Sequence, residues 1–479
     1  MIKLALPTGD LREPTARLLD QAGFANGDYA AGSRTLRLPL PANAEDDAVI
    51  RVFRERDIPI QVALGNYDLG VCSLAWIEEL RLRFPQDELV LLRPLPFGQF
   101  AVHLATDTDT ARRLGPLAHW PGHAGLRIVS DLPTLAEAFA LSARLPAARV
   151  IAIQGSGDAY PPEDADLVLL QAASAGSLAQ RGLQSLATVL AGEAWLIASR
   201  CSLGSRRLAP VLSRLLTLPE AAPFGAGLQL PRLAAHPLAR GWNAWQRPGD
   251  ALRLAVPDGH QQRHACASLR EAGLCFDGYS ESAFVRRPAS GIAGLEVKVI
   301  RPQDMPQQVA LGNFDLAMTG RDVLREHLLA FPDSPVEEVV DLGRSRYGIA
   351  AVVDADLPAT NIREALAVWR QAGHAVVRIA SEYPNIADNY ARSRHFGRYQ
   401  VLPVAGASEG FVPEDAEVLI EGSETGKSIA ANNLKVIDAV FESTNCLISG
   451  RRALPGSAEA LRRRIVDGFQ RAVSAPAPR

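Results

Sequence analysis

The chain has 479 residues, of which 47% are hydrophobic and 22% charged, and its formal net charge is −3. This length exceeds what one hydrophobic core normally supports, so two or more domains are expected. The charge provides no basic field for nucleic acid, and no run of eighteen or more apolar residues could span a membrane. Five scattered cysteines without a CxxC pair argue against a disulfide scaffold or a zinc site and favour the cytoplasm.

The first elements alternate between strand and helix patterns. KLALP is an apolar run that ends at a Pro-x-Gly turn, which predicts a first strand and not a signal peptide. DLREPTARLLDQAG has apolar residues at helical spacing and ends on glycine, so it predicts a helix. A strand-to-helix crossing at DLGVCSLAWIEEL follows, and LRIVSDLPTLAEAFAL repeats the theme. Such alternation predicts parallel α/β sheets with ligands at the carboxyl ends of the strands.

The pattern then repeats along the chain. Three pairs of segments recur in the same order: IPIQVALGNYDL (58–69) with MPQQVALGNFDL (305–316), PEDADLVLL (162–170) with PEDAEVLIE (413–421), and LALPTG (4–9) with LAVPDG (254–259). Their nearly constant offset of about 250 residues indicates a tandem duplication. We predict a first copy at 1–217, a Pro-rich connector at 218–249 and a second copy at 250–479.

The most informative segment is EGSETGKSI at 421–429, which follows the apolar strand AEVLI. A strand, then small hydroxyl and glycine residues, then a helix start is suited to holding a phosphate, because N–H groups, hydroxyls and the helix dipole face the anion. Glu421 can accept hydrogen bonds from sugar hydroxyls, so the segment predicts a ribose-5-phosphate site. A Walker A loop needs four residues between its glycines, and Gly422 and Gly426 have three between them. A Ser/Thr-rich helix N-cap is the structural alternative.

These motifs resemble those of the short-form ATP phosphoribosyltransferase family, which opens histidine biosynthesis. The similar segments are LPTGDL to the family's LPKGRL, RPQDMPQQVALGNFDLAMTGRDVLREH to RPxDIPxxVxxGxxDLGxTGxDxLxE, ASEYPN to ATKYPN, and EGSETGKSI to DIVETGxTL. They cover both copies nearly end to end, more completely in the second. The resemblance implies two bilobed units similar to type II periplasmic binding proteins, each with two α/β subdomains and a cleft between them. The family's C-terminal regulatory domain is expected to be absent.

The resemblance also implies an activity. The phosphoribosyl group of phosphoribosyl pyrophosphate (PRPP) would pass to N1 of ATP, with Mg²⁺ neutralising the pyrophosphate, so positioning and charge matching would dominate catalysis. Glu421 would be the catalytic carboxylate that holds the ribose hydroxyls. The other expected PRPP contacts are Glu424, Thr425, Gly426, Lys427 and Ser428. Candidates for ATP or pyrophosphate contacts are Arg34, Arg54, Arg301, Gly320 and Arg321, the last of which could equally be a helix-surface arginine.

The sequence departs from the family pattern in several places. Glu421 replaces an aspartate, and the lysine of LPKGRL is Thr8 in the first copy and Asp258 in the second. The first copy's loop, LQAASAGSL at 170–178, has Leu170 in place of the carboxylate. Because leucine cannot accept a hydroxyl proton, we expect the first copy to bind PRPP poorly.

The first copy in turn keeps Ser33-Arg34, a pair that the family has and the second copy lacks. This complementary loss predicts a pseudo-dimer within the chain that shares one active site. Higher homo-oligomers or a regulatory subunit stay open. The alternative function is a non-catalytic nucleotide or metabolite sensor, or a regulatory subunit, of the same fold.

Overall fold

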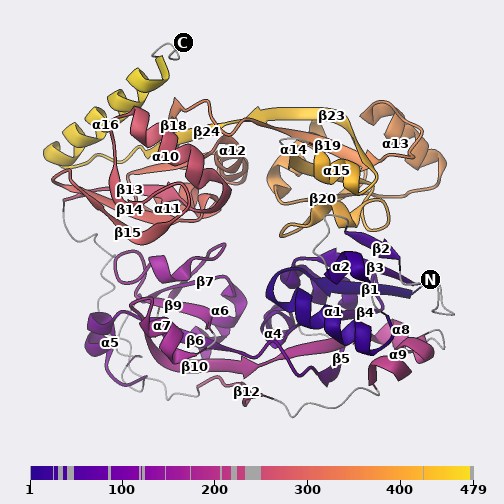
Figure 1. The fold of residues 1–479 in the computed structure, drawn as a ribbon. Coiled ribbons are helices and arrows are strands. Elements are labelled where there is room, and N and C mark those ends of the chain that lie inside the picture. The colour runs from indigo at the N-terminus through magenta and orange to yellow at the C-terminus, as the bar shows by residue number, and fades with distance from the viewer. Residues whose placement is uncertain are drawn as a thin grey trace.

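The computed structural model describes residues 2–24, 26–30, 36–39, 48–84, 88–117, 120, 125–145, 147–172, 174–204, 208–216, 224–231, 250–423 and 426–474. In this part of the chain, four main β-sheets with their helices form four lobes (Figure 1). We name them 1A and 1B in the first copy, and 2A and 2B in the second. In each copy the chain builds lobe A, crosses into lobe B, and returns to lobe A through a late strand.

Lobe 1A has the strand order β2-β3-β1-β4-β11-β5, in which β1 is parallel to both β3 and β4. Its central strand β4 is buried along its whole length, as expected for a strand covered on both faces. The elements are β1 (Ile2–Pro7), α1 (Arg12–Gln21), α2 (Gly27–Ala30), β2 (Arg37–Pro39), β3 (Ala48–Phe53), α3 (Ile58–Ala63), β4 (Leu69–Ser73), α4 (Leu74–Arg83), β5 (Leu89–Pro94), β11 (Ala194–Ser199), α8 (Arg200–Leu203) and α9 (Ala209–Leu216).

Lobe 1B has the strand order β12-β10-β6-β9-β7-β8. The edge strand β12 falls within the predicted connector and pairs antiparallel with β10, so this part of the connector packs on the lobe. The elements are β6 (Phe100–Thr106), α5 (Thr108–Leu114), β7 (Arg127–Ser130), α6 (Pro133–Ser142), β8 (Arg149–Ala152), β9 (Leu167–Ala172), α7 (Ala175–Ala179), β10 (Gln184–Gly192) and β12 (Gly227–Leu228).

Lobe 2A has the order β16-β13-β17-β24-β18 and carries a separate β14-β15 pair. Its elements are β13 (Leu252–Pro257), α10 (Gln262–Glu271), β14 (Phe276–Tyr279), β15 (Phe284–Ser290), β16 (Leu295–Ile300), α11 (Met305–Ala310), β17 (Leu316–Gly320), α12 (Arg321–Ala330), β18 (Val336–Asp341), β24 (Asn445–Gly450) and α16 (Gly456–Ser474). Lobe 2B has the order β21-β20-β22-β19-β23. Its elements are β19 (Tyr347–Asp354), α13 (Ile362–Gln371), β20 (Val377–Ser381), α14 (Pro384–Ser393), β21 (Tyr399–Pro403), β22 (Val418–Ser423), α15 (Lys427–Ala431) and β23 (Leu434–Ser443).

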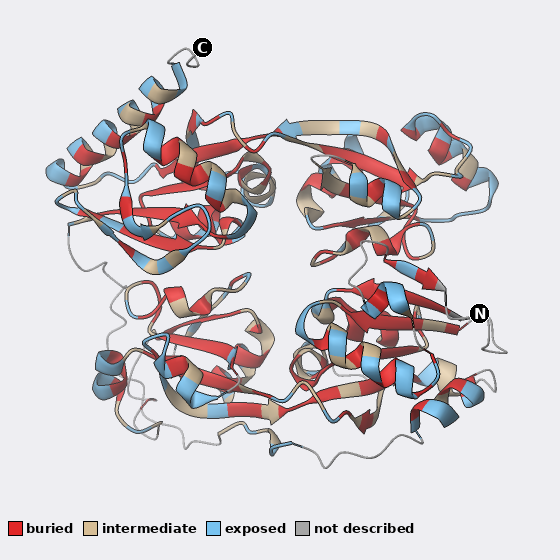
Figure 2. Ribbon diagram, in the orientation of Figure 1, coloured by how far each residue is buried: buried red, intermediate tan, exposed pale blue. Residues whose placement is uncertain are grey.

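Corresponding strands keep the same register in the two copies. Leu4 lies opposite Leu69 between β1 and β4, and Leu254 lies opposite Leu316 between β13 and β17. Figure 2 shows that the central strands of the sheets are buried, whereas the outward faces of the helices are exposed. The predicted fold class, a tandem repeat of bilobed α/β units, is confirmed. Among the described residues, no helix is long and apolar enough to cross a membrane.

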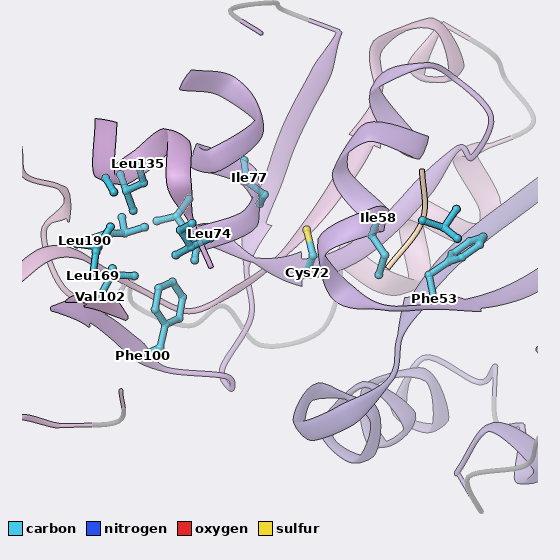
Figure 3. Close-up of a cluster of buried hydrophobic side chains, with 14 of the residues drawn as sticks. Phe53, Ile58, Cys72, Leu74, Ile77, Phe100, Val102, Leu135, Leu169 and Leu190 are labelled. Carbon is cyan, nitrogen blue, oxygen red and sulfur yellow. The ribbon is translucent and has the colours of Figure 1, made fainter. Parts of the chain in front are cut away.

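The two copies pack crosswise, so that lobe 2B lies on lobe 1A and lobe 2A lies on lobe 1B (Figure 1). The rings of Phe53 and Phe411 meet edge-on, with centroids 4.8 Å apart. Figure 3 shows the buried cluster that extends from Phe53 in lobe 1A to Leu169 in lobe 1B, and the same cluster continues into lobe 2B. The hydrophobic core is therefore shared between the copies and is not closed within either one.

Polar contacts follow the same crosswise pattern twice. Asp57 accepts a hydrogen bond from the Ala405 backbone N–H at 3.0 Å, and the corresponding Asp304 accepts one from the Gln154 N–H at 2.9 Å. Burial raises the pKa of both carboxyl groups to about 7. The equivalence of these contacts shows that the copies are related by an approximate two-fold axis.

Candidate functional site

A cleft of about 480 Å³ opens between lobes 2A and 2B. Most of its lining residues lie at or just after the carboxyl ends of β13, β16, β17, β20 and β22, which is the edge where ligands bind in such α/β folds, whereas Ser345 and Tyr347 lie where the chain crosses from lobe 2A into lobe 2B. They are Asp258, Gly259, His260, Gln261, Arg301, Pro302, Gln303, Asp322, Val323, Ser345, Tyr347, Glu382, Tyr383 and Gly422.

Glu421 lies on β22, directly before the cleft-lining Gly422. Burial, followed by the charge of the neighbouring Glu382, raises the pKa of its carboxyl group to about 8. Ser408 Oγ is hydrogen-bonded to this carboxyl group, and the Gly422 N–H donates to Oε1 at 3.0 Å. At pH 7 the group is therefore mostly uncharged.

The predicted PRPP loop, residues 421–428, continues β22 into α15. Gly426 has φ +65° at the N-cap of α15, a conformation that favours glycine, and its N–H donates to Ser423 Oγ at 2.9 Å. Lys427 is exposed and Ser428 is half-buried. The predicted contacts Glu424 and Thr425 lie outside the described residues.

In the corresponding loop of the first copy, the serine side chains form hydrogen bonds within the loop. Leu170, at the position of Glu421, is only 7% exposed and belongs to a core cluster. Ser174 Oγ accepts from the Ser177 N–H at 3.2 Å, and Ser177 Oγ donates to the Ser174 carbonyl at 2.7 Å. This capping box satisfies the loop's hydroxyl groups internally. The loop therefore keeps the helix cap but lacks the carboxylate.

Arg54, predicted to reach ATP or pyrophosphate, comes from the first copy but approaches lobe 2B. A Cβ atom on Gly406 would lie 2.9 Å from Arg54 Nε and 2.8 Å from Glu382 Oε1. Arg54 also lowers the pKa of the Glu382 carboxyl group, although burial is the larger effect and raises it. The structure thus brings Arg54 and Glu382 together at the boundary between the copies. Arg34 lies outside the described residues.

Arg301 lines the cleft and occupies the position that corresponds to Arg54. Its Nη1 donates to Asp258 Oδ1 at 3.3 Å, and its Nε is buried without a hydrogen-bond partner among the described residues. Asp258 also accepts from Arg286 Nη1 at 3.3 Å and from Ser156 Oγ of the first copy at 3.0 Å. The carboxylate that replaces the family's lysine is therefore balanced by two guanidinium groups.

Gly320 and Arg321 begin α12 but differ in environment. A Cβ on Gly320 would lie 2.1 Å from Asp322 Oδ1, so this position requires glycine. Arg321 instead forms ion pairs with Glu338 at 2.9 Å and Asp341 at 3.3 Å. It is not among the described residues that line the cleft.

A polar cluster at the base of the cleft was not predicted from the sequence. The buried Asp322 accepts from Ser443 Oγ at 2.8 Å, where the chain crosses between lobes 2B and 2A. Burial, followed by the charge of Asp322, raises the pKa of Tyr347. Tyr383 belongs to the ASEYPN motif, so the sequence could have pointed to it as a site residue. No motif in the sequence marks Ser443.

The carboxylates around the cleft do not form a metal centre of their own. Within the described ranges, no group of three or more His, Cys, Asp or Glu side chains could hold a metal ion. Glu421, with a pKa of about 8, is also a poor ligand at neutral pH.

The fold and the cleft together define a duplicated, two-lobed α/β protein with a polar ligand site in its second copy. The family model described as HisG, ATP phosphoribosyltransferase, matches residues 54–217 and 301–470, which is more than half of the chain. This chain belongs to the ATP phosphoribosyltransferase family.

Each individual relative matches a stretch of this chain about as long as one copy. An ATP phosphoribosyltransferase of Deinococcus radiodurans is 32% identical over 220 residues, which cover 45% of this chain and 89% of the relative. One of Chlorobium chlorochromatii is 32% identical over 208 residues, and the match spans 64% of that relative's length.

Solved structures are similar at lower identity. A chain of the ATP phosphoribosyl transferase (HisG:HisZ) complex from Thermotoga maritima is 19% identical with a TM-score of 0.36, and the match covers 46% of this chain and 98% of that one. The B. pertussis BvgS periplasmic domain is 13% identical with a TM-score of 0.29, over 99% of this chain and 88% of that one.

Proposed function

We propose that this chain is a cytoplasmic ATP phosphoribosyltransferase that catalyses the first step of histidine biosynthesis. The N1 atom of ATP forms a bond to C1′ of PRPP, and the bond from C1′ to the pyrophosphate oxygen breaks. The products are phosphoribosyl-ATP and pyrophosphate. Family membership supports this reaction class.

One observation carries the proposal. In the second copy, β22 carries the carboxyl group of Glu421 directly before the cleft-lining Gly422, and a glycine-containing turn follows. The first copy has a core leucine and a closed capping box at the same place. The difference supports a working PRPP site in the second copy alone.

On this proposal, different residues of the PRPP loop contact the ribose and the 5-phosphate. Glu421 holds the ribose hydroxyls, and the 5-phosphate contacts Glu424, Thr425, Gly426, Lys427 and Ser428. Backbone N–H groups and hydroxyls around Gly426 suit a phosphate because they donate without needing to be charged. When ionised, Glu421 also stabilises the positive charge that develops on the sugar.

The remaining contacts serve ATP and the departing pyrophosphate. The unpartnered Nε of Arg301 and the approach of Arg54 to Glu382 favour these two guanidinium groups. Gly320 permits a close approach to the start of α12. Arg321 would first have to release Glu338 and Asp341. Magnesium would arrive bound to the pyrophosphate of PRPP and neutralise its charge.

The position of Arg54 supports a shared site. Arg54 belongs to the first copy but lies beside Glu382 of the second, and Arg34 is proposed to act from the same side. The duplicated chain then behaves as a covalent pseudo-dimer, in which one copy supplies residues to the site of the other at high effective concentration.

The direct test is an assay of the full chain with ATP, PRPP and Mg²⁺, followed by the absorbance of phosphoribosyl-ATP. We expect turnover in the wild type and at least about tenfold lower kcat/KM in Arg54→Ala, because a charge-assisted contact to the pyrophosphate is lost. Arg113→Ala, which removes an exposed arginine of the first copy, is the control. Failure of the full chain to form product contradicts the proposal.

A second function is favoured by the acidity of the cleft. Asp258 stands where the family has lysine, and Glu382 and Asp322 line the same cleft. A non-catalytic nucleotide-binding or regulatory subunit would tolerate these changes more easily than an enzyme for a polyanionic substrate. Nucleotide binding without any product from PRPP would favour this alternative.

A further inference from the structure

The two copies differ at a pair of positions that contact each other in the first copy and line the cleft in the second. In the first copy these positions hold Leu11 and Gly98, and a Cβ on Gly98 would lie 2.5 Å from Leu11 Cδ2. In the second copy they hold Gln261 and Ser345. A packed apolar contact is thus replaced by two polar side chains.

The correspondence between these positions follows from the strand crossings. Leu95 N–H donates to the Ala194 carbonyl at 2.8 Å, and Leu342 N–H donates to the Asn445 carbonyl at 3.0 Å. Ser345 lies three residues beyond Leu342, as Gly98 lies three beyond Leu95. Leu11 and Gln261 both end the turn that follows the first strand of their copy.

The two polar side chains do not serve the fold. Gln261 Oε1 and Ser345 Oγ are buried, and neither has a hydrogen-bond partner among the described residues. Ser345, which is only 7% exposed, also has φ +51°, a conformation that disfavours any residue but glycine. Both features lower the stability of the folded chain. Since both residues line the cleft, they indicate a ligand.

The chemistry of the pair restricts the ligand group. The Gln261 oxygen accepts only, so it requires an N–H or O–H donor, whereas its amide nitrogen donates. Asp322 and Glu382 line the same cleft and disfavour a phosphate or carboxylate at this point, whereas Asp258 is balanced by Arg286 and Arg301. A neutral edge with a donor beside an acceptor fits best. The 6-amino group and N7 of adenine form such an edge and pair with an amide side chain through two hydrogen bonds.

We propose that Gln261 and Ser345 form the base subsite for ATP, in which the Gln261 amide pairs with the 6-amino group and N7 of adenine. This inference rests on the proposed function and adds a specificity-determining contact to it. The Ser345 hydroxyl is a further partner of the base. Recognition through this edge leaves N1 free, as attack on C1′ of PRPP requires.

The test is calorimetric binding of the full chain to ATP and to 7-deaza-ATP, without PRPP. The analogue keeps the amino group and N1 but replaces N7 by a carbon. We expect the wild type to bind ATP about tenfold more tightly than the analogue. Gln261→Leu should bind ATP about tenfold more weakly than the wild type and should no longer distinguish the two nucleotides.

Two variants guard against a folding artefact. The double variant Gln261→Leu, Ser345→Gly restores the residues of the first copy, so it should melt no lower than the wild type while losing discrimination. Gln180→Leu makes the same chemical change on the exposed surface of lobe 1B and should keep full discrimination.

Equal wild-type affinity for both nucleotides overturns the inference, as does discrimination that survives in Gln261→Leu. A wild type that binds neither nucleotide also overturns it. Discrimination without formation of phosphoribosyl-ATP supports the subsite but contradicts the proposed function. Formation of phosphoribosyl-ATP without discrimination supports the proposed function but contradicts the subsite, so the two failures are distinguishable.

Discussion

On the proposed function, the charge on the Glu421 carboxyl group decides what the second-copy cleft does at neutral pH. Glu421 is buried beside Glu382, and its pKa is raised to about 8. On the same proposal, an uncharged Glu421 would tolerate the incoming polyanion PRPP, whereas the ionised form would stabilise a sugar cation. The aspartate of the family pattern is thus replaced here by a group that titrates close to physiological pH.

The first prediction concerns the pH profile of activity. We expect wild-type kcat/KM to rise with pH towards a plateau above about pH 8, because kcat/KM reports ionisations of the free enzyme. Glu421→Gln cannot ionise, so its profile should lack this rise. Its kcat/KM should fall about a hundredfold below wild type on the plateau and differ less at pH 6. Parallel profiles of the two proteins would contradict the role of Glu421.

The second prediction concerns stability, measured by thermal unfolding without ligands. Because the pKa of Glu421 is raised from its ordinary value of 4.5 to about 8, its contribution to stability is fully present below pH 4.5. That contribution is lost as the pH rises through 8. Glu421→Gln should therefore melt like the wild type at pH 4.5 and a few degrees higher at pH 9. A lower melting temperature of the variant at pH 9 would contradict the assigned burial effect.

At the scale of elements, the same strand–loop–helix unit begins its helix differently in the two copies. In the first copy, Ser174 and Ser177 satisfy one another, so α7 is simply capped. In the second copy, Gly426 has the positive φ and α15 has no side-chain cap. The helix after β22 therefore lacks the capping box of the helix after β9, although the Gly426 N–H donates within its own loop to Ser423 Oγ.

The third prediction compares these loops by titration with PRPP and Mg²⁺. Ser428→Leu, and likewise a bulky apolar residue at Thr425, should abolish PRPP binding because it fills the phosphate site and removes a hydroxyl. Ser177→Leu should leave PRPP affinity unchanged, although it removes one side of the capping box and lowers stability by about 1 kcal/mol. Comparable loss of binding in both loops would show that both copies bind PRPP.

At the scale of the whole molecule, the crosswise packing of lobes makes each copy depend on the other. Phe53 packs on Phe411, and Tyr160 donates to Asp304 at 3.1 Å, so apolar and polar contacts both cross between copies. The same arrangement carries Arg54 to Glu382. The shared core and the shared site that we propose both follow from this one packing geometry.

The fourth prediction concerns the second copy, residues 250–479, expressed alone. It presents the face that normally covers Phe53, so we expect self-association at high concentration, with Arg301 of one chain taking the place of Arg54. Activity should be low in the monomer and should recover on addition of the first copy. Sedimentation and activity measured over the same concentration range check this. Full activity of the monomer would contradict the pseudo-dimer.

Much of the architecture could be predicted from the sequence alone. Alternating strand and helix patterns give the α/β class, and repeated motifs give the duplication, because both signals are local in the chain. The glycine-containing turn after the apolar strand AEVLI, and the leucine at position 170 where the second copy has Glu421, were likewise readable from residue type and order, whereas PRPP binding by this turn stays a prediction. A resemblance could also name the family, which the match to 54–217 and 301–470 confirms.

Only the tertiary structure decided how these parts combine. The pKa of Glu421 depends on burial and on Glu382, which follows a different strand, so no local pattern could give it. The approach of Arg54 depends on which lobes pack together. The exchange of Leu11 and Gly98 for Gln261 and Ser345 became visible only when the equivalent positions proved to line a cleft. Sequence specifies what each segment can do, whereas charge state and partnership arise from groups that folding brings together across hundreds of residues.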